Sequence, residues 1–156
     1  MMRVATYMKR NVITLPDTAT LGEAAARFAD EHVGTLPIVD SGGHLVGILH
    51  LRDLLGLIMP DFISLLKDFD FVSDFGALEE KAPAPQALAQ KVTRVMERPV
   101  SVPASAGLLL AFAMIDQHDL YDLPVVDESG RLVGLASRVD VGTALLARWR
   151  LSSSAP

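Results

Sequence analysis

One stretch of this chain occurs twice, and this internal repeat restricts the possible folds more than any other feature of the sequence. Residues 36–53 read LPIVDSGGHLVGILHLRD, and residues 123–140 read LPVVDESGRLVGLASRVD. Half of the aligned positions are identical, and the alignment needs no gap. Such a repeat predicts two copies of one structural unit, related by pseudo-symmetry.

Each copy predicts a β-hairpin that leads into a helix. In the first copy, the aliphatic segments 38–39 and 45–46 flank residues 40–43, DSGG, whose composition suits a tight reversal. An aspartate follows at the first turn of the predicted helix, Asp53 in one copy and Asp140 in the other. The helix macrodipole favours negative charge there, so capping alone is one explanation for both carboxylates.

A strand and a helix are expected before each hairpin. Residues 12–15 and 100–102 predict strands, each stopped by the proline that follows. Thr20 and Glu23 have the spacing of a capping box, which predicts a helix to about His32. Its buried face is expected to hold Leu21, Ala24, Ala25 and Phe28. The counterpart is expected from near Ser105 to about His118, with Leu108, Leu109, Phe112 and Ile115 buried.

Composition argues against several classes of protein. Half of the 156 residues are hydrophobic and 21% are charged, which is typical of a folded globular chain. A net charge of −5 argues against a nucleic-acid surface, which needs a basic stripe. The sequence has no cysteine for disulfides, and no apolar run long enough to cross a bilayer. We therefore expect a cytoplasmic protein without nucleic-acid or membrane partners.

The repeats divide the chain into residues 1–58 and 92–150, with a tail at 151–156. Between the repeats lies an insert, residues 59–91, whose apolar positions recur at helical spacing before an Ala-Pro linker. The insert contains four of the six phenylalanines. We predict that this aromatic surface packs on its own domain or across a homodimer, and the alternative is a docking surface for another protein.

Residues 4–55 and 92–147 resemble cystathionine-β-synthase (CBS) domains. The resemblance rests on the hairpin beginning Leu-Pro and on the pattern Gly-x-x-Ser/Thr-x-x-Asp, present at residues 47–53 and, in full, at 134–140. The pair is similar to a Bateman module, which implies an α/β (α+β) fold of two pseudo-symmetric repeats. Each repeat is expected to hold a small mixed sheet with helices packed on it, and two clefts are expected between the repeats.

The resemblance also implies a function. Bateman modules usually form flat homodimers and bind adenine nucleotides or related adenosyl ligands, which change the arrangement of the two halves. The implied role is regulatory, with AMP, ADP or ATP as a possible ligand and no required cofactor or metal. We expect no enzymatic activity, because no nucleophile, base and orienting group can be assembled from this sequence. The alternative is a ligand-free scaffold for dimerisation or protein interaction that uses the Phe-rich insert.

The main cleft is expected beside Asp140. Its carboxylate can accept hydrogen bonds from both ribose hydroxyls, and Ser137 offers a hydroxyl to ribose or phosphate. Helix-start amides with Arg138 could meet the phosphate. The resemblance implies that the purine lies between apolar side chains and backbone of the two repeats. The residues predicted for this cleft are Asp140, Ser137, Arg138, Leu135, Tyr121, Ile13, Val33 and Gly34.

The second cleft, beside Asp53, is predicted to be the weaker of the two. His50 stands where the pattern has Ser or Thr, and an imidazole is bulkier, although a protonated ring could contact a phosphate. The residues predicted for this cleft are Asp53, His50, Ile48, Val100, Ser101, Leu120 and Tyr121. Asp122 stands where nucleotide-binding members often have a basic residue, which favours ligands with less charge than a triphosphate.

Overall fold

The computed structural model describes residues 1–57 and 83–152 of the chain. They form two three-stranded sheets, one in each repeat, with the strand orders β1-β2-β3 and β4-β5-β6. In each sheet the first strand is parallel to the second, and the second is antiparallel to the third. The predicted architecture of two pseudo-symmetric repeats with mixed sheets is therefore confirmed. The phenylalanine-rich part of the predicted insert lies outside the described residues.

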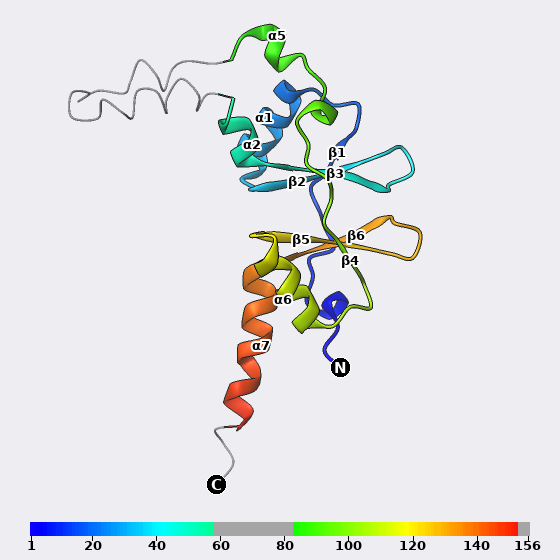
Figure 1. The fold of residues 1–156 in the computed structure, drawn as a ribbon, viewed down its shortest axis with the longest axis vertical. Coiled ribbons are helices and arrows are strands. Elements are labelled where there is room, and N and C mark those ends of the chain that lie inside the picture. The colour runs from blue at the N-terminus through cyan, green and yellow to red at the C-terminus, as the bar shows by residue number, and fades with distance from the viewer. Residues whose placement is uncertain (58–82, 153–156) are drawn as a thin grey trace, which may run out of the picture.

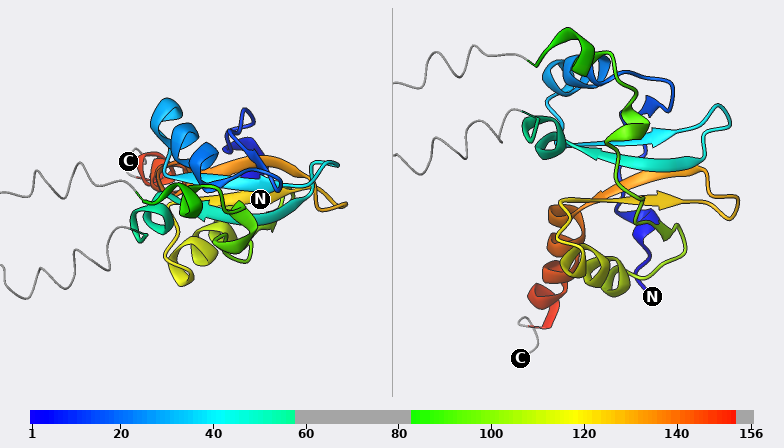
Figure 2. Two further views of the ribbon diagram at one scale, coloured as in Figure 1. Left: turned by 90° about the horizontal axis from the view of Figure 1, so that it is seen from above. Right: turned by 45° about the horizontal axis from the view of Figure 1, so that its top comes forward.

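The two repeats contain the same elements in the same order. The first repeat has β1 (Leu15–Pro16), α1 (Leu21–Glu31), β2 (Thr35–Val39), β3 (Leu45–His50) and α2 (Leu51–Leu55). The second has β4 (Val102–Pro103), α6 (Leu108–Gln117), β5 (Asp122–Val126), β6 (Leu132–Ser137) and α7 (Arg138–Ser152). A short helix, α5 (Pro85–Leu88), precedes the second repeat. In Figures 1 and 2 the sheets lie in the middle of the molecule, and the helices cover their outer sides.

The two hairpin turns are built alike and contact each other. Gly43 and Gly130 adopt left-handed backbone conformations, with φ of 83° and 86°, which glycine adopts without steric cost. The Leu45 amide donates to the Gly130 carbonyl at 3.1 Å, and the Leu132 amide donates to the Gly43 carbonyl at 3.1 Å. These bonds join the tips of the two sheets.

An aspartate closes each turn. Asp40 accepts from the amides of Gly42 and His44, both at 2.9 Å, and the bond from His44 holds the pKa of this carboxyl below its usual value. Asp127 accepts from the Ser129 hydroxyl at 2.7 Å, and this bond does most to lower its pKa. Both turns therefore favour an ionised carboxylate.

The segment in front of each repeat packs into the other repeat. Residues 4–6 form the short 3-10 helix η1, and Val4 lies in the second core, where its amide donates to the Ala106 carbonyl at 2.8 Å. Residues 92–94 form η3, and the Val92 amide donates to the Ala19 carbonyl of the first repeat at 2.9 Å. We call residues 4–9 and 92–97 the crossing segments. They join the two halves because each core contains a residue from the other half.

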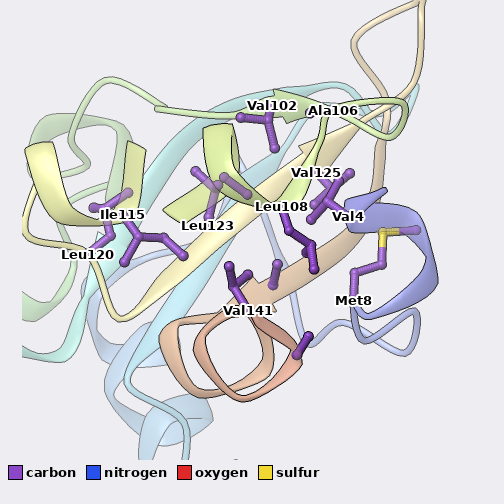
Figure 3. Close-up of a cluster of buried hydrophobic side chains, with 13 residues drawn as sticks. Val4, Met8, Val102, Ala106, Leu108, Ile115, Leu120, Leu123, Val125 and Val141 are labelled. Atoms are coloured by element: carbon purple, nitrogen blue, oxygen red, sulfur yellow. The ribbon is translucent and has the colours of Figure 1, made fainter. Parts of the chain in front are cut away.

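The second core lies between its sheet and helices α6 and α7 (Figure 3). Val4 and Met8 of the first crossing segment reach it from one side, next to Val125. The first core has the same plan, with Val92 buried and Met96 partly buried against it. Both cores are small, so the crossing residues are a substantial part of the apolar surface that each one buries.

The structure corrects several local predictions. The strands predicted at 12–15 and 100–102 begin later, and each includes the proline that was expected to stop it. Proline is tolerated there because β1 and β4 are edge strands. An edge strand has a partner on one side only, so the missing amide donor can face away from the sheet without the loss of a hydrogen bond between strands. The helix expected from near Ser105 begins at Leu108.

The predicted buried faces of α1 and α6 were also partly wrong. Ala25 of α1 is exposed, and Leu109 and Phe112 of α6 are 72% and 38% exposed. Leu108 and Ile115 face the core as predicted, and Ala111 lies there with them. Because α6 is apolar almost all round, its sequence does not reveal which stripe is buried.

Gly134 should be intolerant of any side chain, because the first crossing segment passes directly over it. A Cβ built at Gly134 would overlap the Met8 side chain and lie 3.0 Å from the Lys9 carbonyl oxygen. We expect Gly134→Ala to lower the free energy of unfolding by about 1–3 kcal/mol, measured by urea denaturation. Gly142→Ala in α7 is the control, since nothing lies within 4 Å of its Cβ position, and it should stabilise by about 1 kcal/mol. Equal effects of the two substitutions would contradict the close approach.

Candidate ligand-binding crevices between the repeats

A crevice of about 260 Å³ lies between the repeats beside β6, and we call it the Asp140 crevice. Residues 11–13 and 32–35 of the first repeat supply most of its wall, and Leu135 and Asp122 come from the second. Four residues predicted for the main cleft meet here: Ile13, Val33, Gly34 and Leu135. The crevice thus has a lining contributed by both halves of the chain, with apolar side chains beside polar and charged ones.

Ser137 and Asp140 do not line this crevice; they follow its β6 wall, at the end of β6 and in the first turn of α7. Ser137 lies two residues beyond Leu135 on β6, so both side chains are on the same face of the strand. Ser137 is also the register partner of Asp122, which lines the crevice. Each side chain caps α7: the Ser137 hydroxyl oxygen accepts from the Asp140 amide at 2.9 Å, and Asp140 Oδ2 accepts from the Ser137 amide at 3.2 Å.

The capping bonds leave ligand-binding groups available. Within residues 1–57 and 83–152, Asp140 Oδ1 has no hydrogen-bond partner, and the Ser137 hydroxyl keeps its proton to donate. A carboxylate oxygen and a hydroxyl next to an apolar lining can bind a sugar whose attached ring lies against that lining. Helix capping and ligand binding are therefore compatible roles for the same two residues.

Tyr121 and Arg138, also predicted for this cleft, lie elsewhere. Tyr121 is 73% exposed, and the Arg138 guanidinium lies 5.7 Å from the centre of its ring. Arg138 Nε donates to the Leu120 carbonyl at 3.1 Å, and its Nη2 is 3.4 Å from Asp119 Oδ1. These bonds hold Arg138 on the loop between α6 and β5, and neither side chain lines either crevice.

A second crevice of about 220 Å³ lies at the pseudo-symmetric place beside β3, and we call it the Asp53 crevice. Of the residues predicted for it, Ile48, His50, Val100 and Leu120 line it. Asp53 and Ser101 do not. Like Asp140, Asp53 caps its helix, with Oδ2 accepting from the His50 amide at 2.7 Å.

His50 is engaged inside the Asp53 crevice. Its side chain is 8% exposed, and Nε2 lies 3.0 Å from Glu97 Oε2 of the second crossing segment. Glu97 itself is fixed by two backbone bonds with Ile48, at 2.7 and 3.0 Å. The imidazole therefore forms part of the wall of the Asp53 crevice, whereas Ser137, at the equivalent position, does not line the Asp140 crevice.

A larger hollow, of about 630 Å³, does not lie between the repeats. It lies among α1, α2 and α5, and its walls are mainly alanine, leucine and phenylalanine side chains. Such a lining offers little to bind the charged or hydroxylated part of a ligand, so we place the candidate site in the crevices.

The sequence matches the CBS domain family over residues 4–60 and 92–147, which is more than half of the chain. The chain belongs to the CBS domain family. No helix of this CBS pair is long and apolar enough to cross a membrane, as far as the structure describes the chain.

Solved structures share the architecture of the CBS pair. A structure of CBSX2 in complex with AMP is 25% identical, with a TM-score of 0.71, and covers 94% of this chain and 98% of the other. CBSX2 from Arabidopsis thaliana gives a TM-score of 0.73 at 24% identity, covering 96% and 97%. An uncharacterized protein of Methanocaldococcus jannaschii is 29% identical over 89% of this chain, which spans 31% of that protein's length.

The sequence analysis of this CBS pair missed several lining residues of the Asp140 crevice. These are Lys9, Asn11, Val12, His32 and Thr35; Asp122, which the sequence analysis did single out, lines both crevices. The sequence contained one indication that Lys9 has an equivalent in the second repeat: VATYM at residues 4–8 aligns with VTRVM at residues 92–96. Extended by one residue, the alignment makes Lys9 equivalent to Glu97, whose carboxylate contacts His50.

Asp140 should stabilise the protein even without a ligand, because it caps α7. We expect Asp140→Ala to lower the free energy of unfolding by about 1 kcal/mol in guanidinium denaturation of the ligand-free protein. Asp140→Asn keeps an acceptor oxygen for the Ser137 amide and should cost less. If the alanine variant were as stable as the wild type, the capping role would be wrong.

Proposed function

We propose that this CBS pair is a regulatory module that binds an adenosine-containing ligand in the Asp140 crevice. The proposal depends on one observation: both repeats line one crevice with apolar and polar side chains, and its β6 wall leads to a serine and an aspartate at the start of α7. Family membership supports it, and so does the complex of the similar CBSX2 with AMP. The role is sensing and not catalysis.

The residues suggest how such a ligand would lie. The purine would pack against Ile13, Val33 and Leu135, and the ribose hydroxyls would donate to the free oxygen of Asp140. The volume of about 260 Å³ is near the lower end of known ligand sites, about 300–1,000 Å³. With the Asp122 carboxylate also in the lining, this small volume favours AMP over ATP.

A bound ligand would act by shifting the arrangement of the repeats. Because the crevice wall comes from both halves, the ligand bridges them and favours the relative orientation in which its contacts are best. The exposed outer helices would change their relative positions with that orientation, and a protein partner that contacts them would bind one arrangement better than the other.

Calorimetric titration with AMP, ADP, ATP and S-adenosylmethionine tests this function. We expect AMP to bind the wild type and Asp140→Ala to weaken binding by about tenfold to a hundredfold, since a charge-assisted hydrogen bond contributes about 1.5–3 kcal/mol. Asp53→Ala is the matched control, because it removes the equivalent helix cap in the other crevice, and it should leave the affinity unchanged. A ligand that bound the wild type and Asp140→Ala equally would rule out the site.

A second candidate function, association with a second copy of the chain, is favoured by exposed apolar side chains. On α6, Leu109, Leu110 and Phe112 are 72%, 52% and 38% exposed, which is unusual for a surface that contacts only water. On the first repeat, the apolar hollow among α1, α2 and α5 is also open. A protein that dimerised through these surfaces but bound no nucleotide would be a scaffold and not a sensor.

Sedimentation velocity tests the association. A charge placed in the exposed apolar surface of α6 should disfavour its burial, so we expect Leu109→Asp to shift a dimer toward monomer at micromolar concentration. Glu128→Lys, on an exposed hairpin turn, serves as the control and should not change the sedimentation coefficient. A dimer that persists in Leu109→Asp would place the interface elsewhere.

A further inference from the structure

The two crossing segments place different residues at one equivalent position. Lys9 exchanges two backbone hydrogen bonds with Leu135, both at 2.9 Å, and Glu97 exchanges two with Ile48. Leu135 and Ile48 are themselves equivalent positions of the two repeats. Lys9 and Glu97 therefore stand at the same place beside the two crevices, with opposite charges.

In the Asp53 crevice this position blocks an anion. The Glu97 carboxylate lies 3.0 Å from His50 Nε2. The imidazole nitrogen that could contact a phosphate is therefore already paired with a carboxylate of the same chain. Asp122 adds a second carboxylate to the lining; Arg52, Arg98 and His118 also line the crevice, so the block applies to a phosphate placed at His50. A phosphate that approached His50 would have to displace Glu97 and leave a nearly buried imidazole without its partner, which is unfavourable.

In the Asp140 crevice the same position favours an anion. Ser137 replaces His50, and its hydroxyl proton remains free to donate. Lys9 replaces Glu97, lines the crevice, and is exposed. Among the described residues no ion pair involves Lys9, whose charge opposes that of Asp122 across the same crevice. A small phosphate-bearing ligand would meet the Lys9 cation here, and one that extended along β6 would also reach the Ser137 hydroxyl.

We propose that the crossing-segment residue, Lys9 in one crevice and Glu97 in the other, decides which crevice accepts a phosphate group. The inference rests on the proposed nucleotide-binding function and makes it more specific. Lys9 binds the phosphate in the Asp140 crevice, and the Glu97–His50 pair closes the Asp53 crevice. One AMP then binds per chain.

Removing the charge of Lys9 tests the first half of the inference. In calorimetric titrations, Lys9→Gln should bind AMP about tenfold more weakly than the wild type, because it lacks one charge-assisted bond. Its affinity for adenosine, which has no phosphate, should be unchanged. Glu97→Gln at the equivalent position is the matched control and should leave the AMP affinity of the Asp140 crevice as it was.

Placing the residues of the Asp140 crevice at the equivalent positions of the Asp53 crevice tests the second half of the inference. The double substitution His50→Ser with Glu97→Lys gives the Asp53 crevice the pair found in the other crevice, and should raise the stoichiometry from one AMP per chain to two. Retained binding at the first crevice shows that the variant is folded. If the double variant does not fold, the comparison of AMP with adenosine in Lys9→Gln still decides the role of Lys9.

The outcomes separate this inference from the function on which it rests. A wild type that binds neither AMP nor adenosine overturns both. A wild type that binds AMP overturns only the inference if Lys9→Gln binds AMP as tightly, or loses AMP and adenosine equally. A folded double variant that still takes one AMP overturns the proposed closure of the Asp53 crevice.

Discussion

The exchange of the two crossing segments is the interaction on which the rest of the structure depends. Val4 is buried in the core of the second repeat, and Val92 is buried in the core of the first. Each segment then passes over a glycine of the other sheet, Gly134 or Gly47, where an added Cβ would overlap the Met8 or Met96 side chain. Two small cores that would be marginal alone are thereby stabilised by the same set of contacts.

The crossing also builds the crevices. After passing Gly134, the first segment pairs with Leu135 and continues into residues 11–13, which form one wall of the Asp140 crevice. The second segment reaches the other crevice at Glu97 in the same way. Each candidate site therefore has lining residues from both repeats, and a ligand there contacts both halves.

The parts of the fold predicted from sequence are those set by neighbouring residues. The hairpins follow from their turn residues, and the bond from the Glu23 amide to Thr20 Oγ1, at 3.2 Å, follows from a capping pattern. The partner of each crossing segment could not be predicted, because an apolar run indicates burial without saying against what. Tyr121 was misplaced for a related reason: a motif position does not specify whether a side chain turns inward.

The backbone bond from Val4 to Ala106 has a consequence for how the protein reaches its native state. Val4 finds its partner Ala106 only after about a hundred more residues have been made, so the second core cannot be completed before that point in synthesis. Contacts so distant along the chain also slow folding, because a large loop must close before they form. Expressed alone, either half would lack part of its interior and would be expected to aggregate or to borrow the missing segment from another chain.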